Sequence, residues 1–336
     1  MLILGIETSC DETSAAVVED GTNILSNIVV SQQTLHSRFG GVVPEIACRE
    51  HTKAIISVVD TAIAEAKTSI NEMDAISVAN TPGLIGALLI GLTCAKTLSF
   101  TLQVPLITVN HLHAHIFASN LAHGPIGYPA ISLVVSGGHT TLFLSESEVK
   151  HTPVGRTIDD AAGEAFDKVG KILGLGYPSG PVIDAIAKKG NRQAVTFPRS
   201  YLGKGSLDFS FSGIKTAVLY HCSGQDSKSG KRTLTLHDRE IADVSASFQE
   251  AVVDVLVDKT IFAARKFSVN RILFGGGVAA NSRLRVRLGE AARQHDIQLY
   301  SPPKNLCIDN AAMIAGLAFH KYLAKDFSTL DAAAIP

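Results

Sequence analysis

Two stretches of the chain repeat the same order of a buried strand, a tight turn and a returning strand. The first covers residues 2–18, with its turn at Ser9-Cys10-Asp11-Glu12, and the second covers residues 130–144, with its turn at Ser136-Gly137-Gly138. Near-continuous apolar runs such as 130–135 are typical of strands whose two faces are both covered. The repeated order predicts a duplicated fold, although the two stretches differ in their residues.

The remainder of the chain alternates between helical and strand patterns. The expected helices are 51–67, one led by Pro82, 160–173, 181–189, 238–266, one from about 281, and 309–324; the expected strands are 75–79, 106–109, 271–274 and 298–300. Units of strand, glycine turn and helix form open sheets with helices on their faces, and ligands bind beyond the carboxyl ends of the strands. We therefore expect two α/β lobes with a central cleft as the ligand site.

The composition excludes several classes of protein. The chain has 336 residues, of which 46% are apolar, and this is enough for two domains with a core each. The net charge of -1 argues against a protein that binds nucleic acid by electrostatics alone, because phosphate neutralisation supplies most non-specific affinity. The five cysteines have no Cys-x-x-Cys spacing, which excludes zinc-finger chemistry and favours free thiols in a reducing compartment.

The sequence also predicts a protein that does not cross a membrane. Residues 1–7 enter a strand pattern directly, without a basic leader segment, so we expect a cytoplasmic location. The longest apolar stretch, 84–102, has the length of a membrane span. It contains Gly86 and Lys96 and follows the helix-start signal Thr81-Pro82-Gly83, which favours a buried helix.

A histidine pair is the clearest candidate for a metal site. His111 and His115 stand four residues apart after the apolar run 106–109. If a helix begins near Asn110, both imidazoles project from one helical face and can share a metal ion. Without a third ligand, a solvated or core-facing pair is an equally good interpretation. A metalloprotease is excluded, because its pattern needs a glutamate where this chain has Leu112.

Asp309 is the candidate third ligand. It stands at the start of the last expected helix, where the simplest role for an aspartate is that of an N-cap. Alternatively, its carboxylate joins the two histidines. Two imidazoles and one carboxylate leave open positions on iron(II) and also suit a three-ligand zinc site. Both roles stay open at this stage.

Three turns can hold an anion through backbone amides: 7–13, 136–140 and 275–281. A single glycine turn is more often an ordinary hairpin turn. Three of them, at matching places in two similar halves, favour a nucleotide-sized ligand.

Acidic residues near these turns are further candidates for ligand contacts. The segment 159–168 has four carboxylates at a helix start, where acids are common for electrostatic reasons alone. The functional alternative is that Asp167 accepts hydrogen bonds from the ligand. In the turn 177–181, Gly180 allows the backbone to approach a ligand, and Asp184 lies one turn into the next helix.

Seven segments carry a resemblance to one known family: 5–13 (GIETSCDET), 40–45 (GGVVPE), 110–115 (NHLHAH), 133–140 (LVVSGGHT), 159–167 (DDAAGEAFD), 208–213 (DFSFSG) and 275–281 (GGGVAAN). Together they closely resemble the TsaD/Gcp family of bacterial type. The resemblance spans essentially the whole chain, and it is far more specific than any one motif.

This resemblance implies a duplicated actin/sugar-kinase/Hsp70-like (ASKHA) fold, and we expect residues 1–115 plus 309–336 to form the N-terminal lobe and residues 116–308 the C-terminal lobe. It implies transfer of a threonylcarbamoyl group from threonylcarbamoyl-AMP to the N6 amine of adenosine 37 in tRNA. The implied metal ligands are His111, His115 and Asp309, for one divalent ion per subunit, iron(II) or alternatively zinc. The implied substrate contacts are Val134, Val135, Ser136, Gly137, Gly138, Asp167, Gly180, Asp184 and Asn281.

The implied protein partners are TsaB, a related inactive paralogue, and the ATPase TsaE. Asp11 and Glu12 are candidate polar helpers in catalysis, since no serine or cysteine nucleophile with a partner histidine is evident. The rival functions are an ATP-dependent small-molecule kinase of the same fold and a nucleotide-regulated binding module. A mobile loop is expected at 223–232. Arg283, Arg285 and Arg287 form either basic surface or a solvated helix face.

Overall fold

The computed structural model describes residues 1–223 and 237–336, which form two compact units. Unit 1 comprises Met1–Gly127, Glu146–His151 and Pro302–Pro336, and unit 2 comprises Tyr128–Ser145 and Thr152–Ser301. The lobe boundary that we expected at residue 115 falls inside helix α4 (His111–His123), and unit 1 keeps this helix whole.

Unit 1 contains a five-stranded sheet in the order β3-β2-β1-β4-β5. β1, β2 and β3 are antiparallel neighbours, whereas β1, β4 and β5 run parallel. The strands are β1 (Leu2–Glu7), β2 (Glu12–Glu19), β3 (Asn23–Ser31), β4 (Ala75–Thr81) and β5 (Leu106–Asn110).

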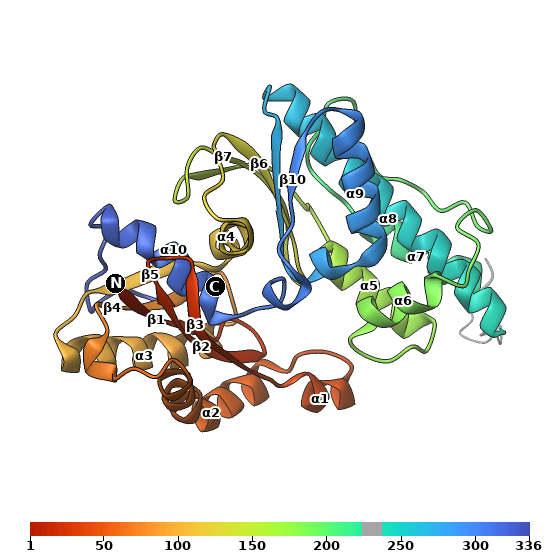
Figure 1. Cartoon of the computed structure of the whole chain (residues 1–336). Coiled ribbons are helices and arrows are strands. Elements are labelled where there is room, and N and C mark those ends of the chain that lie inside the picture. Colours follow the sequence, from red (N-terminus) through yellow and green to blue (C-terminus); the bar gives the residue numbers. More distant parts are fainter. Residues whose placement is uncertain (224–236) are drawn as a thin grey trace. The chain divides into compact units, whose positions relative to one another are not determined.

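Helices cover both faces of this sheet (Figure 1). α4 and α10 pack on one face with Ile3, and α2 and α3 pack on the other with Leu4 and Ile6. Successive residues of β1 enter different cores because neighbouring side chains of a strand point to opposite faces. Besides α4, the helices of unit 1 are α1 (Gln33–His36), α2 (Pro44–Glu65), α3 (Ile85–Leu102) and α10 (Ala311–Leu323).

Unit 2 repeats the topology of unit 1. Its sheet has the order β10-β9-β6-β7-β8, in which β6 and β7 are antiparallel and β6, β9 and β10 are parallel. The order matches that of unit 1 when β6 takes the place of β1, so the duplicated α/β fold is confirmed. The strands are β6 (Ala130–Val135), β7 (Thr140–Ser145), β8 (His151–Arg156), β9 (Arg271–Gly275) and β10 (Gln298–Tyr300).

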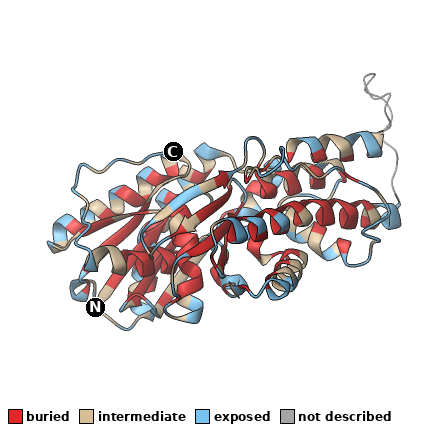
Figure 2. Ribbon diagram, turned by 90° about the horizontal axis from the view of Figure 1, so that it is seen from above, coloured by how far each residue is buried: buried red, intermediate tan, exposed pale blue. Residues whose placement is uncertain are grey.

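The longest helix of unit 2, α8, contributes many side chains to the core (Figure 2). Its Phe248 is fully buried and meets the ring of Phe166 edge-on, with the ring centroids 5.1 Å apart. The helices of unit 2 are α5 (Ala162–Ile172), α6 (Ser179–Ala187), α7 (Ser212–Ser223), α8 (Asp238–Lys266) and α9 (Ser282–Gln294).

Several elements differ from the sequence-based expectation. β3, β8 and α7 were not expected, because edge strands and half-buried helices have weak apolar periodicity. α2 begins at Pro44 rather than near His51, since proline is well suited to the first turn of a helix. The mobile loop predicted at 223–232 lies outside the described residues, apart from Ser223, which ends α7.

Helix α3 is buried along one side only, whereas the sequence favours a fully buried helix. It is long and apolar enough to cross a membrane, with a mean hydropathy of 1.6, and 33% of it is buried. Leu88 and Leu92 enter the core, whereas Leu89 and Phe100 are about half exposed or more. The helix covers one face of the sheet, so only one side of it reaches the core.

Replacing Phe248 with alanine is expected to lower the free energy of unfolding by about 3–5 kcal/mol, because a fully buried ring leaves a cavity. Phe262→Ala on the same helix is the matched control, since Phe262 is 42% exposed. Urea unfolding of both variants measures the difference, and equal losses would contradict the assigned core.

Candidate metal centre

The two candidate histidine ligands lie at the N-terminus of α4. Strand β5 ends at Asn110 and the helix begins at His111, as the sequence predicts. The Asn110 side chain caps the helix by accepting hydrogen bonds from the N–H groups of Leu112 and His113, at 2.9 and 3.2 Å. His111 and His115 are therefore one turn apart on the same face.

Asp309 lies one residue before the N-cap of α10. The cap is Asn310, whose side chain accepts a hydrogen bond from the N–H of Met313 at 3.2 Å. The N-cap role that we considered for Asp309 therefore belongs to its neighbour, and the Asp309 carboxylate interacts elsewhere.

The structure brings His111, His115 and Asp309 together in unit 1. Asp309 Oδ1 is 3.1 Å from His115 Nε2 and 3.5 Å from His111 Nε2. One possible ligand atom from each residue lies within 4.8 Å of the other two. The two imidazole rings are steeply inclined, at 78°, with their centroids 4.5 Å apart. Three donor atoms thus face one point, as a three-ligand metal site requires.

Glu7, at the end of β1, holds His111 from the other side. Its fully buried carboxylate lies 2.9 Å from His111 Nδ1, and it also accepts a hydrogen bond from the N–H of Ser9 at 2.5 Å. When Nδ1–H donates to Glu7, the lone pair of Nε2 points toward the Asp309 side. A carboxylate on the outer nitrogen of a ligand histidine fixes its ring orientation and makes it a stronger donor.

The carboxylates of this cluster favour a positive charge on the histidines between them. Burial by itself would lower the pKa of His111, but the carboxylates of Glu7 and Asp309 outweigh this effect and raise it well above the usual value. Burial would likewise raise the pKa of Asp309, but His111 and His115 outweigh it and hold the pKa below its usual range. Burial and the neighbouring His111 lower the pKa of His115, which favours its neutral form.

This donor set fits a divalent cation. Neutral imidazole nitrogens and an ionised carboxylate are the ligand forms that metals bind. The fully buried Glu7 contacts His111, and Asp309, whose side chain is 18% exposed, contacts both histidines; a cation would balance the charge of these two carboxylates. His115 Nδ1 is buried and has no hydrogen-bond partner within the described chain, so only its Nε2 side is engaged.

Asp11 and Glu12 lie at the start of β2 in the same unit. Burial raises the pKa of Glu12 well above its usual value, and the charges of Asp309 and Asp11 add to this effect. The hydroxyl of Ser31 donates a hydrogen bond to Glu12 at 3.0 Å. The charge of Asp309, the candidate metal ligand, therefore affects the pKa of Glu12.

His113 points away from the pair, as the helical spacing predicts. Its ring lies 4.6 Å from that of His151, and burial lowers its pKa to about 4. The middle histidine of the segment 110–115 is therefore not part of the three-residue cluster.

In unit 2, two of the expected glycine turns follow neighbouring parallel strands. β6 ends at Val135 and β9 at Gly275, and Val134 pairs with Gly275. A Cβ atom on Gly276 would lie 2.4 Å from the Val135 carbonyl oxygen, and the φ of Gly276 is +94°, which side chains rarely adopt. The close approach of the two turns therefore depends on glycine at position 276.

The N-terminus of α5 approaches the same turn. A Cβ atom on Gly163 would lie 2.5 Å from the carbonyl oxygen of Ser136 and 2.7 Å from the Cα of Gly137. Three backbone segments therefore converge beside residues 136–138. The N–H of Ser136 is bonded to the carbonyl oxygen of His139, so an anion at this turn would be bound by the N–H groups of the glycines.

Asp167 and Asp184 have hydrogen bonds to helix N-termini in unit 2. Asp167 accepts a hydrogen bond from the N–H of Ser179 at 2.8 Å, at the first residue of α6. Asp184 accepts one from the hydroxyl of Ser282 at 2.8 Å, at the first residue of α9. These bonds hold both carboxylates in fixed orientations.

Asn281 is the N-cap of α9. Its side-chain oxygen accepts a hydrogen bond from the N–H of Leu284 at 3.0 Å, and its amide donates to Gln249 at 2.8 Å. Gly180, in the first turn of α6, has open space where a Cβ would stand, as expected for a position that a ligand can approach.

Sequence reasoning missed the role of Glu7. The available signal was an acidic residue at the end of a buried apolar strand, since an unpaired buried carboxylate is costly. The partner that justifies it, His111, is 104 residues away in the chain.

We expect Asp309→Asn to reduce the metal content of the purified protein to background, because the amide removes the only anionic ligand of the cluster. His123→Ala is the control, since His123 is an exposed histidine on the same helix. Elemental analysis of anaerobically purified protein measures both variants. A full complement of metal in Asp309→Asn would refute the assignment.

The variant Glu7→Gln tests the outer carboxylate separately. Glutamine keeps the shape of the side chain but loses its charge, so we expect metal affinity to fall by about 10–100-fold. Competition with a chelator of known affinity measures the change. An unchanged affinity together with a lowered Tm would instead assign Glu7 a purely structural role.

Comparison with known proteins points to one family. The family model for TsaD, tRNA N6-adenosine threonylcarbamoyltransferase, matches residues 23–316. The proteins of that name from Moorella thermoacetica and Thermodesulfovibrio yellowstonii are 50% and 51% identical to this chain. The first alignment covers 99% of this chain and 96% of the relative, and the second covers 98% and 97%.

Solved structures with low sequence identity share the fold. Full-length HypF, in the phosphate- and nucleotide-bound form, matches all of this chain over 47% of its own length, with a TM-score of 0.61 and 14% identity. Component A of (R)-2-hydroxyglutaryl-CoA dehydratase from Acidaminococcus fermentans matches 96% of this chain over 99% of its own, with a TM-score of 0.56 and 14% identity. These likenesses show the ASKHA fold alone.

The family model covers most of the chain, and the relatives align along nearly their whole length. The protein therefore belongs to the TsaD family of tRNA N6-adenosine threonylcarbamoyltransferases, which are acyltransferases.

Proposed function

We propose that the protein transfers the threonylcarbamoyl group from threonylcarbamoyl-AMP to the N6 amine of adenosine 37, in tRNAs that read codons beginning with adenine. The family match supports the reaction class. The observation that carries the proposal is the convergence of His111, His115 and Asp309 on one point, with Glu7 behind His111. The same family match favours acyl transfer over a small-molecule kinase.

The reaction is one acyl transfer with AMP as the leaving group. The N6 nitrogen attacks the carbonyl carbon of the threonylcarbamoyl group, a C–N bond forms, and the bond from that carbon to the AMP phosphate oxygen breaks. The amine loses one proton. We propose direct attack without a covalent enzyme intermediate, because no serine-histidine-aspartate or cysteine-histidine arrangement is evident in the sequence. Ser9 Oγ lies 3.2 Å from His111 Nδ1, but Glu7 contacts that same nitrogen, which is not the order of a catalytic triad.

His111 Nε2, His115 Nε2 and a carboxylate oxygen of Asp309 would hold one divalent metal. The two-histidine, one-carboxylate set favours iron(II), with zinc as the alternative. When bound, such an ion supplies Lewis-acid polarisation of a substrate oxygen. Glu7 holds His111 in the orientation that this requires.

The backbone turns of unit 2 support a site for the adenylate part of the donor. Val134 to Gly138 are the proposed contacts, and the amides of Gly137 and Gly138 would face the AMP moiety, which lowers the cost of expelling AMP. Asp167, Gly180, Asp184 and Asn281 are the proposed neighbouring contacts. Asp167 and Asp184 are already fixed by hydrogen bonds, so they are ordered before the ligand arrives.

Asp11 and Glu12 are the candidates for moving the amine proton. The reaction releases one proton, and a carboxylate near the acyl group can accept it. By resemblance to its family, the protein would act in the cytoplasm together with TsaB and the ATPase TsaE.

A single-turnover assay tests the function. Purified protein, its partners, tRNA and threonylcarbamoyl-AMP should yield modified tRNA and AMP, and His111→Ala should abolish this transfer because it removes a metal ligand. His123→Ala is the control and should transfer at the wild-type rate. An unchanged rate with metal-free protein would reject the Lewis-acid role. Absence of transfer by the wild-type protein would reject the function.

A further inference from the structure

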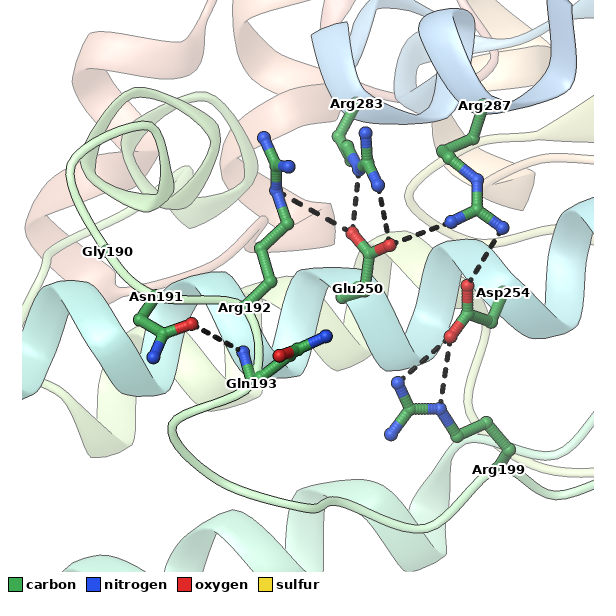
Figure 3. A pocket seen from close by; sticks show the side chains of 9 residues that line it. All are labelled: Gly190, Asn191, Arg192, Gln193, Arg199, Glu250, Asp254, Arg283 and Arg287. Carbon is green, nitrogen blue, oxygen red and sulfur yellow. Dashed lines mark hydrogen bonds and ion pairs between the residues drawn. The ribbon is translucent and has the colours of Figure 1, made fainter. Parts of the chain in front are cut away.

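Unit 2 has a pocket that belongs neither to the histidine cluster nor to the glycine turns. Its volume is about 620 Å³, and Figure 3 shows that its walls carry four arginines around two carboxylates. The lining residues are Gly190, Asn191, Arg192, Gln193, Arg199, Glu250, Asp254, Arg283 and Arg287. They come from the segment 190–199 and from helices α8 and α9.

The pocket has a surplus of positive charge. Four guanidinium groups face two carboxylates, so the lining carries a net charge of four minus two, or +2. Arginine stays protonated in proteins. Burial would raise the pKa of Glu250, but the hydrogen bond and the charges of Arg283, followed by Arg287 and Arg192, outweigh burial and lower it. The carboxylate therefore stays ionised, and the surplus persists across ordinary pH.

Two of the four arginines neutralise the two acids. Arg283 holds Glu250 with two hydrogen bonds of 2.6 Å. Arg287 bridges the acids, at 2.9 Å from Glu250 and 3.3 Å from Asp254. These side chains are 17% and 30% exposed, so Arg283 and Arg287 are tied to α8, whereas Arg285, the third arginine of that prediction, donates to the carbonyl oxygen of Ala279.

Among the residues that line the pocket, no further acid is left to balance the charges of the other two arginines, Arg192 and Arg199. Arg199 donates to Asp254 at 2.9 and 3.2 Å, although that carboxylate already meets Arg287. Arg192 has the longest ion pair of the pocket, 3.9 Å to Glu250, and its side chain is 52% exposed. Gathering four like charges costs free energy unless an anion offsets it.

We propose that this pocket binds a backbone phosphate of the tRNA substrate, with Arg192 as its principal donor and Arg199, which is held by Asp254 and by the carbonyl oxygen of Phe197, adding positive charge beside it. The planar guanidinium fork matches the oxygens of a phosphate. The amide side chains of Asn191 and Gln193 line the same pocket and supply neutral donors. The whole chain has a net charge of -1, so affinity for a polyanion must come from local positive surface such as this.

The inference rests on tRNA being the substrate and deepens that proposal. Its test measures the affinity of the full-length protein for an unmodified tRNA transcript as a function of KCl concentration. Arg192→Gln should weaken binding several-fold and lower the slope of log affinity against log salt by about one, since one phosphate contact is lost. Arg192→Lys should restore part of the affinity. Arg265→Gln is the control, an exposed arginine of α8 outside the pocket.

Steady-state transfer kinetics separate this inference from the function itself. We expect Arg192→Gln to raise the KM for tRNA while leaving kcat and the KM for threonylcarbamoyl-AMP unchanged. If the wild-type protein transfers nothing, the function fails, whereas the tRNA affinities still decide the role of the pocket. If the wild-type protein transfers and Arg192→Gln has an unchanged KM for tRNA, the pocket inference fails alone.

Titration with inorganic phosphate distinguishes the source of the anion. Loss of phosphate binding in Arg192→Gln with unaltered tRNA binding would assign the pocket to a free anion and overturn the tRNA assignment. The double variant Arg192→Gln, Arg199→Gln provides the last check. A lowered Tm with wild-type tRNA affinity and salt slope would show that the arginines only hold α8, α9 and the segment 190–199 together.

Discussion

The candidate centre depends on two linked ion pairs, one between Glu7 and His111 and one between His111 and Asp309. A carboxylate with no exposure is costly in a protein core unless it is paired. Here Glu7 binds His111, and Asp309 lies against both histidines from the far side. The pair of carboxylates raises the pKa of His111 and marks a point where positive charge is stabilised. A divalent cation would meet the same need.

The duplicated sheet explains why such a cluster forms. In unit 1, the parallel strands β1 and β5 end near Glu7 and Asn110, and helix α10 returns from the C-terminal region to cover the same sheet. In unit 2, β6, which corresponds to β1, and its parallel neighbour β9, which corresponds to β4, both end in glycine turns. The same topology therefore presents a cluster of histidines and a carboxylate in one unit and glycine turns in the other.

The arginine pocket shows how a chain with little net charge can still attract a polyanion. The acids of α8 fix two arginines of α9, and the segment 190–199 adds two more beside them. This excess of positive charge is confined to the pocket, so the net charge of the whole chain does not reveal it. Clustered charge of this kind acts at short range, because salt screens exposed charges beyond about 10 Å.

Local sequence patterns determine much of this protein. Continuous apolar runs specify β1 and β6, glycine turns specify the strand ends, and the cap at Asn110 places His111 and His115 on one helical face. These features depend on residues only a few positions apart. The family resemblance named Asp309 as the third ligand, but only the tertiary structure decided that this residue, 194 positions from His115, faces the pair rather than capping its helix. The tertiary structure alone showed that Glu7 holds His111 and that Arg192 meets Glu250. Such contacts join segments distant in the chain, and they follow from the order in which strands pair and helices cover the sheet. Local periodicity contains no information about that order.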